Sequence, residues 1–319
     1  MKKKKFDPEE IIVKEDTIGD RFFLICRGKF RIYRNNKTIR ELEKGNYFGE
    51  ISLINKENRT ASVSSVDNSV CYILTKEDFL SIIDQGVLDL IKSKIYLQDT
   101  SILLNELYYI KFLGKGKFGN VSLVHNKKNL YAIKAISRKI VDKKKSLSKY
   151  FLTEKRIMQS IDHPFIARFV KSLKNENFCF FLLEFINGDN LDNYLRIKSN
   201  IRDVFETKFY IATLLYTVDY LHKKLISHRD LKPCNIMIDK NGYLKIIDFG
   251  TSKIINDFTH TIIGTPHYIA PEILIGKGYS LSTDYWSIGI CMYEIFYGIY
   301  PFGNTANDIM EVYKDIVNK

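Results

Sequence analysis

The hydrophobic pattern of the chain changes in kind along its length. Residues 21–74 contain short runs in which apolar and polar positions alternate, and turn-forming residues separate these runs. Alternation with a period of two is typical of strands that bury one face. The pattern therefore predicts an antiparallel barrel or sandwich with strands at Arg21–Arg27, Phe30–Arg34, Thr38–Leu42, Ala61–Val66 and Ser69–Leu74.

Apolar positions between residues 76 and 106 follow a helical spacing instead. Thr75 stands just before this stretch and can act as its N-cap, because its hydroxyl can accept a bond from the first turn. Gly86 is expected to interrupt the helix. We therefore assign residues 1–84 to a first domain, residues 85–106 to a helical linker and residues 107–319 to a second domain.

The second domain mixes strands and helices. Phe178–Leu183 is a nearly continuous apolar run, as expected of a strand that is buried on both faces. Residues 203–224 have the spacing of a long helix, which Asp203 can cap. A β-rich first domain followed by this mixed domain places the chain in the α+β class.

Composition narrows the class of protein. A chain of 319 residues suggests about two domains, and 45% hydrophobic with 27% charged residues indicates a globular protein. The five cysteines have no metal-binding spacing, and their odd number argues against a disulfide framework. We therefore expect a reducing, cytoplasmic setting.

The net charge of +12 could indicate nucleic acid or an anionic membrane as a partner. Much of the basic excess, however, lies in two runs, Lys2–Lys5 and Lys143–Lys145. We interpret these runs as solvated loops and a tail, and we expect no nucleic-acid partner. Because no stretch of 18 uncharged apolar residues occurs, no transmembrane segment is expected either.

Two short motifs carry the candidate chemistry. Residues 228–235 read HRDLKPCN and residues 248–250 read DFG. Phosphoryl transfer needs a carboxylate facing the acceptor hydroxyl, which Asp230 can supply, and oxygen ligands for Mg²⁺, which Asn235 and Asp248 can supply. Lys232 can neutralise charge on the moving phosphoryl group. In this order the motifs resemble the catalytic and metal loops of protein kinases.

The resemblance extends to the nucleotide side. Residues 114–121 fit the pattern G-x-G-x-x-G-x-V, and a strand ending in Lys134 follows them. Glu154 stands where kinases place the carboxylate that pairs with this lysine. The resemblance implies that ATP is bound by Gly114, Gly116, Gly119, Val121, Ala132, Lys134, Glu154, Glu184, Ile186 and Met237.

The activation segment implied by the resemblance runs from Asp248 to Glu272. Thr265 is expected to form the floor of the acceptor pocket and to touch Asp230 and Lys232. Residues 259–266 read THTIIGTP, which resembles the AGC group, where the threonine at position 261 is phosphorylated. Arg229 and Lys253 are placed to bind that phosphate, whereas the third position, on the Glu154 helix, is occupied by Tyr150.

A second candidate site interrupts the strands of the first domain. Gly49 precedes a predicted short helix that begins at Glu50, and Arg59 can add a bidentate contact to a phosphate bound there. Considered alone, these residues also fit a β-bulge with a surface salt bridge. Phe48-Gly49-Glu50 with residues 59–63, which read RTASV, resembles the phosphate-binding cassette of cyclic-nucleotide-binding domains.

The cassette resemblance implies a ligand set of Gly49, Glu50, Ile51, Ser52, Arg59 and Thr60. Glu50 would bind the ribose 2′-hydroxyl and Arg59 the cyclic phosphate. A threonine directly after this arginine is typical of sites that prefer cGMP, because its hydroxyl can reach both the phosphate and the guanine amino group. Sites that prefer cAMP usually carry alanine there.

Together the two halves resemble cGMP-dependent protein kinases. This implies a β-barrel cyclic-nucleotide-binding domain followed by a bilobal kinase fold, and a cytoplasmic Ser/Thr kinase that uses ATP, Mg²⁺, cGMP and protein substrates. A nucleotide-sensing fragment with an inactive kinase lobe and a cAMP-responsive kinase are the alternatives.

Two features depart from the family pattern. The sequence lacks the last helices of the large lobe, which suggests a fragment that is truncated at both ends. Asn190 and Cys234 stand where glutamates usually bind substrate arginines, and only Glu294 remains. A strict preference for basic substrates is therefore not expected.

Overall fold

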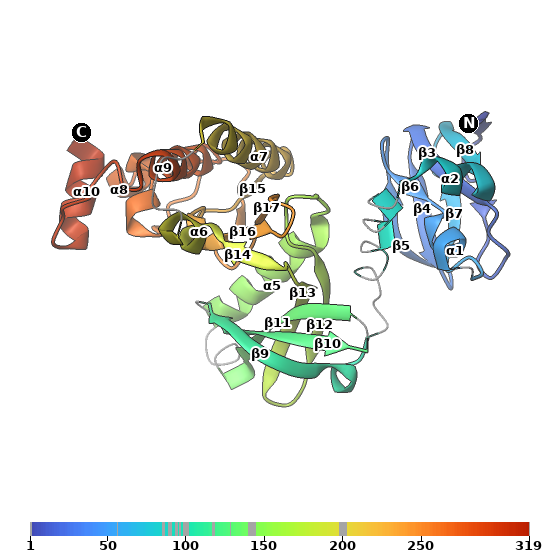
Figure 1. Ribbon diagram of the computed structural model, residues 1–319, viewed down its shortest axis with the longest axis horizontal. Helices are drawn as coiled ribbons and strands as arrows, with labels where there is room; N and C mark the ends of the chain where they lie inside the picture. The colour runs from blue at the N-terminus through green and yellow to red at the C-terminus, as the bar shows by residue number, and fades with distance from the viewer. Residues whose placement is uncertain are drawn as a thin grey trace. The chain divides into compact units, whose positions relative to one another are not determined.

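The structure is a computed structural model that describes residues 2–55, 57–84, 87–88, 91–92, 95, 97, 102–116, 119–127, 129–139, 145–197 and 203–318. Residues 1–99 and 100–319 form two compact units, which the colour ramp of Figure 1 separates. The predicted helix break at Gly86, most of the predicted linker and part of the lysine run at 143–145 lie outside the described residues.

The first unit is built from two antiparallel sheets of four strands each, which confirms the β-rich architecture predicted for it. One sheet has the order β1 (Lys2–Phe6), β8 (Ser69–Thr75), β3 (Arg21–Arg27), β6 (Tyr47–Phe48). The other has the order β2 (Ile11–Val13), β7 (Ser62–Ser65), β4 (Phe30–Arg34), β5 (Lys37–Leu42).

An aromatic cluster fills the core of this unit. Phe30 is fully buried, and its ring lies 6.1 Å from that of Phe6 and 5.4 Å from that of Phe48. Phe48 in turn stacks on Phe23 at 4.7 Å. These side chains belong to both sheets, so the cluster joins the two layers.

Two helices complete the first unit. Helix α1 (Glu50–Asn55) begins at the predicted residue. Helix α2 (Lys76–Ile82) is capped by Thr75, whose hydroxyl accepts a bond from the backbone nitrogen of Asp78, as predicted. Phe79 of α2 is fully buried, with its ring 4.6 Å from that of Phe22.

The lysine run Lys2–Lys5 is part of a strand, so the prediction of a tail was wrong. The run forms most of β1, which pairs with β8 at the edge of its sheet while Phe6 inserts into the core. The four lysines are exposed. Lysines on an edge strand hinder the addition of another strand, and the sheet therefore tolerates this unusual composition.

The second unit has a small lobe and a large lobe. The small lobe contains one antiparallel sheet and helix α5 (Lys145–Ser160), and the short helix η1 (Leu104–Glu106) precedes it. The sheet order is β12 (Phe169–Lys174), β13 (Phe178–Glu184), β11 (Asn129–Ser137), β10 (Asn120–Asn126), β9 (Tyr108–Lys115). The predicted strand at residues 178–183 is thereby confirmed as β13.

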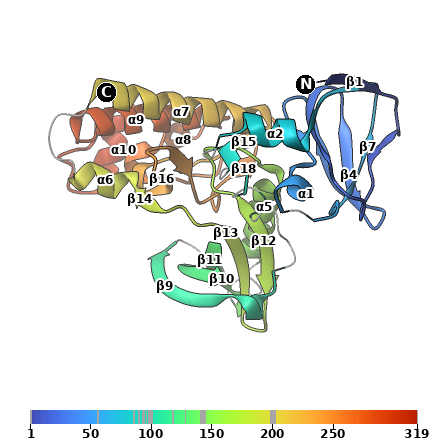
Figure 2. The same ribbon diagram turned by 45° about the vertical axis from the view of Figure 1, so that its right-hand side comes forward.

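The large lobe is mainly helical, and α7 (Val204–Lys223) packs beside α9 (Thr283–Tyr297) in both views (Figures 1 and 2). Asp203 caps α7 as predicted. The remaining helices are α6 (Leu191–Ile197), η2 (Pro233–Asn235), η3 (Pro266–Tyr268), α8 (Pro271–Ile275) and α10 (Ile309–Asn318). The short strands are β14 (Gly188–Asn190), β15 (Ile226–Ser227), β16 (Ile236–Asp239), β17 (Leu244–Ile246) and β18 (Lys253–Ile254).

Apolar residues of α6, α7, α9 and the β16–β17 hairpin share one core with residues of α5. This shared core fixes the loops between β15 and β18, which carry both kinase-like motifs. Among the described residues, no helix is both long enough and apolar enough to span a membrane.

The aromatic cluster generates a stability prediction. Phe30→Ala should lower the unfolding free energy of the first unit by about 3–5 kcal/mol, because it removes a fully buried ring and leaves a cavity. Ile39→Ala, at an exposed position of β5, should change it by less than about 0.5 kcal/mol. Native-state hydrogen exchange of β3 and β4 measures both effects, and equal protection in the two variants would contradict the assigned core.

Candidate functional site

The catalytic-loop motif is held by a buried carboxylate. Asp284, on α9, is fully buried and accepts hydrogen bonds from the backbone nitrogens of His228 and Arg229, both at 2.9 Å. Its Oδ2 also lies 2.9 Å from His222 Nε2. These bonds hold Arg229 in the left-handed region at φ 66°, and the next residue is Asp230.

Three residues predicted to act together lie together. The Thr265 hydroxyl donates to Asp230 Oδ1 at 2.7 Å and accepts from Lys232 Nζ at 2.6 Å. Lys232 Nζ also lies 3.1 Å from Asp230 Oδ2. The Asn235 side-chain nitrogen donates to the same Asp230 oxygen at 3.1 Å and to the Asp230 backbone carbonyl at 2.8 Å. The Asp230 carboxylate therefore has a fixed orientation.

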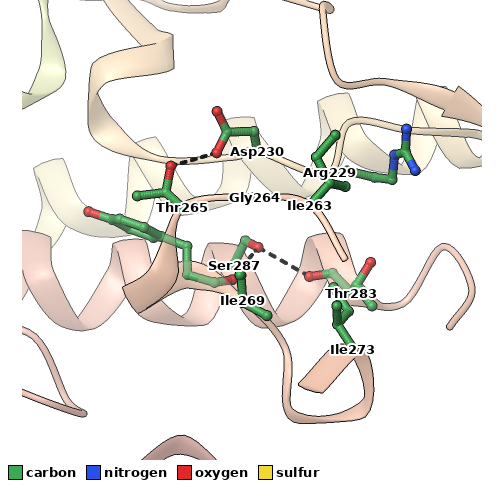
Figure 3. A pocket seen from close by; sticks show the side chains of 10 residues that line it. Arg229, Asp230, Ile263, Gly264, Thr265, Ile269, Ile273, Thr283 and Ser287 are labelled. Carbon is green, nitrogen blue, oxygen red and sulfur yellow. Dashed lines mark hydrogen bonds between the residues drawn. The ribbon is translucent and has the colours of Figure 1, made fainter. Parts of the chain in front are cut away.

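The segment that carries Thr265 rests on α9. Asp230 and Thr265 line a small pocket between this segment and the first turns of α9 (Figure 3). The Ser287 hydroxyl, in the same pocket, lies 2.9 Å from the Tyr268 carbonyl and 3.2 Å from that of Thr283. The pocket is completed by Arg229, Ile263, Gly264, Tyr268, Ile269, Ile273 and Thr283.

An ion-pair network joins the two lobes of the second unit. Lys134 Nζ donates to Glu154 Oε1 at 2.7 Å and to Asp248 Oδ1 at 2.8 Å. Lys134 and Glu154 are each only 4% exposed. Glu154 belongs to α5 in the small lobe and Asp248 to the large lobe, so one ammonium group bridges carboxylates from both.

Burial and charge act in opposite directions in this network. Burial lowers the pKa of Lys134, but the two carboxylates outweigh burial and raise it. Burial raises the pKa of Asp248, yet the Lys134 ammonium brings it below its ordinary value, so Asp248 is ionised at neutral pH. For Glu154 burial dominates, and its pKa is raised despite Lys134.

The predicted magnesium ligands offer two oxygens. The Asn235 amide nitrogen is bonded to Asp230, so its oxygen is the atom left for a cation. Asp248 Oδ1 accepts from Lys134 and from the Gly250 nitrogen at 3.3 Å. Within the described residues no group of three or more His, Cys, Asp or Glu side chains could hold a metal ion. This donor set suits Mg²⁺ that takes its other ligands from phosphates and water.

The glycine-rich segment forms a turn between β9 and β10. The Gly116 nitrogen donates to the Gly119 carbonyl at 2.8 Å, and Gly114 pairs with Val121. A Cβ at Gly119 would lie 2.1 Å from the Ala135 carbonyl oxygen, so only glycine fits. Lys117 and Phe118, at the tip of the predicted loop, lie outside the described residues.

The expected hinge residue Glu184 has a fully engaged side chain. One carboxylate oxygen accepts from Lys245 Nζ at 2.7 Å, and the other accepts from the Arg168 nitrogen at 3.0 Å. Only its backbone is available for a base. Ile186 is buried, whereas Val121 on β10, Ala132 on β11 and Met237 on β16 are half-buried.

The hydrophobic residues around the second motif pack as expected. The rings of His228 and Phe249 meet edge to face at 5.0 Å, and both residues are buried. Phe249 and Met158 belong to one core, against which Phe169 packs. His228 therefore has a packing role here.

In the first unit, Arg59 is buried beneath the predicted cassette and is only 5% exposed. Its Nη1 donates to the Gly49 carbonyl at 2.7 Å and to the Ser52 hydroxyl at 2.8 Å, and its Nη2 donates to the Arg21 carbonyl at 2.7 Å. Burial lowers the pKa of Arg59, and the charges of Asp20 and Glu50 act against this effect. This burial rules out the surface salt bridge of the alternative interpretation.

The other cassette residues surround Arg59. Glu50 and Ser52 are buried at the start of α1, Ile51 is half-buried, and Thr60 is exposed. Gly49 has φ 92°, and a Cβ there would lie 2.7 Å from the Arg21 carbonyl oxygen. Sequence reasoning missed this carbonyl, because every residue has one and no residue type signals it.

Comparison with known proteins agrees with this geometry. Residues 108–318 match the protein kinase domain family, and residues 3–86 match the cyclic nucleotide-binding domain family. The chain is 40% identical to a cGMP-dependent protein kinase of Plasmodium berghei (strain Anka) over 99% of its length. Identity is 38% to one of Eimeria tenella over 98%, and 39% to one of Toxoplasma gondii over 97%. The chain spans 37%, 31% and 31% of these relatives, respectively.

The ion-pair network generates a prediction about pH. Lys134→Met should destabilise the second unit by about 3–5 kcal/mol, because Glu154 is left buried without a cation. Its pKa should then rise further, so the folded state retains a proton that the unfolded state releases above about pH 4.3. The unfolding free energy of the variant should therefore fall more steeply than that of the parent as pH rises from about 5 to 7.

Urea unfolding followed by circular dichroism across this pH range measures the effect. Lys111→Met, at an exposed position of β9, is the matched control and should follow the parent. Parallel pH profiles for Lys134→Met and Lys111→Met would contradict the coupling of Lys134 to Glu154.

Proposed function

The chain belongs to the protein kinase family, and from this premise we propose that it is a cGMP-regulated Ser/Thr kinase that transfers the γ-phosphate of ATP to protein hydroxyls. The observation that carries the proposal is the bridge from Lys134 to both Glu154 and Asp248. A nucleotide-sensing module with an inactive kinase lobe would have no need to keep two buried carboxylates aligned on one lysine.

The acceptor side of the proposed reaction is built on Asp230. Its carboxylate would accept the proton of the substrate hydroxyl, and the Thr265 hydroxyl fixes its orientation through a 2.7 Å bond. Lys232, which contacts both residues, would neutralise charge that develops on the transferred group. Asn235 and Asp248 would hold Mg²⁺, which supplies charge compensation at the phosphates when it is bound.

The nucleotide side uses residues of both lobes. Lys134 would orient the ATP phosphates, and the backbone turn from Gly114 to Gly119 would cover them. The adenine would meet the backbone of Glu184 and Ile186, between the half-buried side chains of Val121, Ala132 and Met237.

The regulatory ligand is proposed to be cGMP. Arg59 would bind the cyclic phosphate, and Glu50 would accept a bond from the ribose. Thr60 is exposed directly after the buried arginine, so its hydroxyl can face the ligand. The relatives named cGMP-dependent protein kinases support this choice over cAMP.

The remaining proposals concern setting and substrates. The cysteines are all free, which supports a reducing cytoplasm. Of the three acidic positions that would bind substrate arginines, only Glu294 is present, and it accepts a bond from the Tyr268 hydroxyl. Protein substrates with fewer basic residues are therefore proposed.

Catalytic roles generate the next prediction. Asp230→Asn should retain ATP binding but lower phosphate transfer by about 10²–10⁴-fold, because the variant cannot take the acceptor proton. Asp248→Ala should lose productive binding of Mg²⁺ and ATP as well. Transfer of radiolabelled phosphate, with and without cGMP, and equilibrium binding of ATP separate the two outcomes.

Asp219→Asn is the control, because this carboxylate forms only an exposed pair with Lys223 on α7. It should retain both binding and transfer. The assays are run on this chain and on a version extended to the length of its relatives. No transfer by the extended protein would reject the kinase proposal, and full transfer by Asp230→Asn would reject Asp230 as the base.

Nucleotide choice generates a further prediction. The Thr60 hydroxyl offers a bond worth about 1–1.5 kcal/mol, which corresponds to about five- to tenfold in affinity. cGMP should therefore bind more tightly than cAMP, and Thr60→Ala should reduce the difference by that factor. Thr38→Ala, at an exposed position of β5, should not. Calorimetric titration of the chain decides the matter, and equal affinities in the parent would point to a cAMP-responsive or nucleotide-independent protein.

A further inference from the structure

Three cationic side chains from three elements of the second unit converge on the activation segment. Arg229 belongs to the catalytic loop, Lys253 to β18 and Lys149 to α5. None of the three forms an ion pair with a carboxylate in the described part of the chain. A group of like charges without a counter-charge is costly, and such a group is typical of a site for an anion.

Arg229 lies beside residue 261. The guanidinium is 6% exposed, and its Nε donates to the Thr251 carbonyl at 2.7 Å. Its Nη1 donates to the Tyr279 hydroxyl at 3.3 Å, and this hydroxyl donates to the Thr261 carbonyl at 2.6 Å. Tyr279 thus joins Arg229 to the backbone of Thr261. The described residues provide no partner for Nη2, which can still bind an anion.

Lys253 lies on the other side of the segment. Its Nζ donates to the Thr259 hydroxyl at 2.7 Å. Burial and the positive charges of Arg229 and Lys149 all lower the pKa of Lys253. The three cations are therefore close enough to repel one another.

Lys149 connects this group to helix α5. The sequence pattern points to Tyr150 as the residue of this helix that faces the segment, and Tyr150 carries no positive charge. In the structure α5 packs against β18, and it is the charge of Lys149 that acts on Lys253. The same helix carries Glu154, the partner of Lys134.

We propose that Lys149, Arg229 and Lys253 form the receptor for a phosphate carried by Thr261, with Lys149 as the contact that attaches α5 to it. Thr261 is exposed, whereas the hydroxyls of Thr251 and Thr259 are buried and already bonded, so Thr261 is the residue a kinase can reach. A phosphothreonine supplies close to two negative charges and three acceptor oxygens for these donors.

The modification is itself a phosphoryl transfer, so the inference rests on the proposed function of the family site. The Thr261 hydroxyl oxygen forms a bond to the γ-phosphorus of ATP, the bond to the ADP oxygen breaks, and the hydroxyl proton passes to the catalytic carboxylate of the acting kinase. The bound phosphate then links the residue before Asp230 to the helix that carries Glu154, and this link couples the acceptor side to the Lys134 ion pair.

The test compares proteins that carry threonine or phosphothreonine at position 261, installed during translation, so that no activity of the chain is needed. In the parent, phosphothreonine should raise the Tm of the second unit by about 3 °C and slow dephosphorylation by an added phosphatase. Lys149→Ala should lose at least half of this rise and should be dephosphorylated several-fold faster. Lys149→Arg should restore both values.

Arg156→Ala is the matched control, because it removes one exposed positive charge from the same helix two turns away. It should keep the full phosphate-dependent rise. A parent without such a rise, or equal behaviour of Lys149→Ala and Arg156→Ala, would overturn the proposal. An extended chain that transfers no phosphate but shows the rise would reject the kinase activity and leave this receptor standing.

Discussion

The geometry of the proposed active site depends on one buried carboxylate. Asp284 has no exposure to solvent, so its charge must be met by donors, and the backbone nitrogens of His228 and Arg229 meet it together with His222. These bonds hold the main chain at Arg229 in a conformation that a non-glycine residue rarely adopts. Asp230 follows directly, and its carboxylate therefore emerges where Thr265 and Lys232 can contact it. Helix α9 is the fixed base from which the catalytic loop is built.

A second constraint joins the lobes. Lys134 can satisfy Glu154 and Asp248 at the same time only when α5 and the loop after β17 are both in place. The network is electrically unbalanced, with two carboxylates to one ammonium, and Asp248 is the member that burial and charge leave most easily ionised. A divalent cation at Asp248 would correct the imbalance, which connects the geometry of the apo site to its proposed metal.

The sequence predicted these groupings because the family motifs are short and each residue type has one chemical use. Spacing located the strands of the first unit, the start of α1, the cap of α2 and the cluster of Asp230, Lys232 and Thr265. It failed where backbone or helix phase decides. The Arg21 carbonyl that holds Arg59 has no residue signature, the lysine run became a strand through pairing with β8, and the rotation of α5 presents Lys149 to Lys253 where residue counting selects Tyr150.

Arg59 and Arg229 are positioned by the same physical means, although they belong to different units. Backbone carbonyls of Gly49 and Arg21 orient the first guanidinium, and the carbonyl of Thr251 orients the second. Neither forms an ion pair with a carboxylate in the described part of the chain. A carbonyl fixes a guanidinium without cancelling its charge, whereas a carboxylate would compete with an incoming phosphate for the same donors. Lys134 is held by carboxylates instead, and its role is to align two lobes. The acceptor that a cation is given thus distinguishes the positions proposed to receive a phosphate from the position proposed to assemble the site.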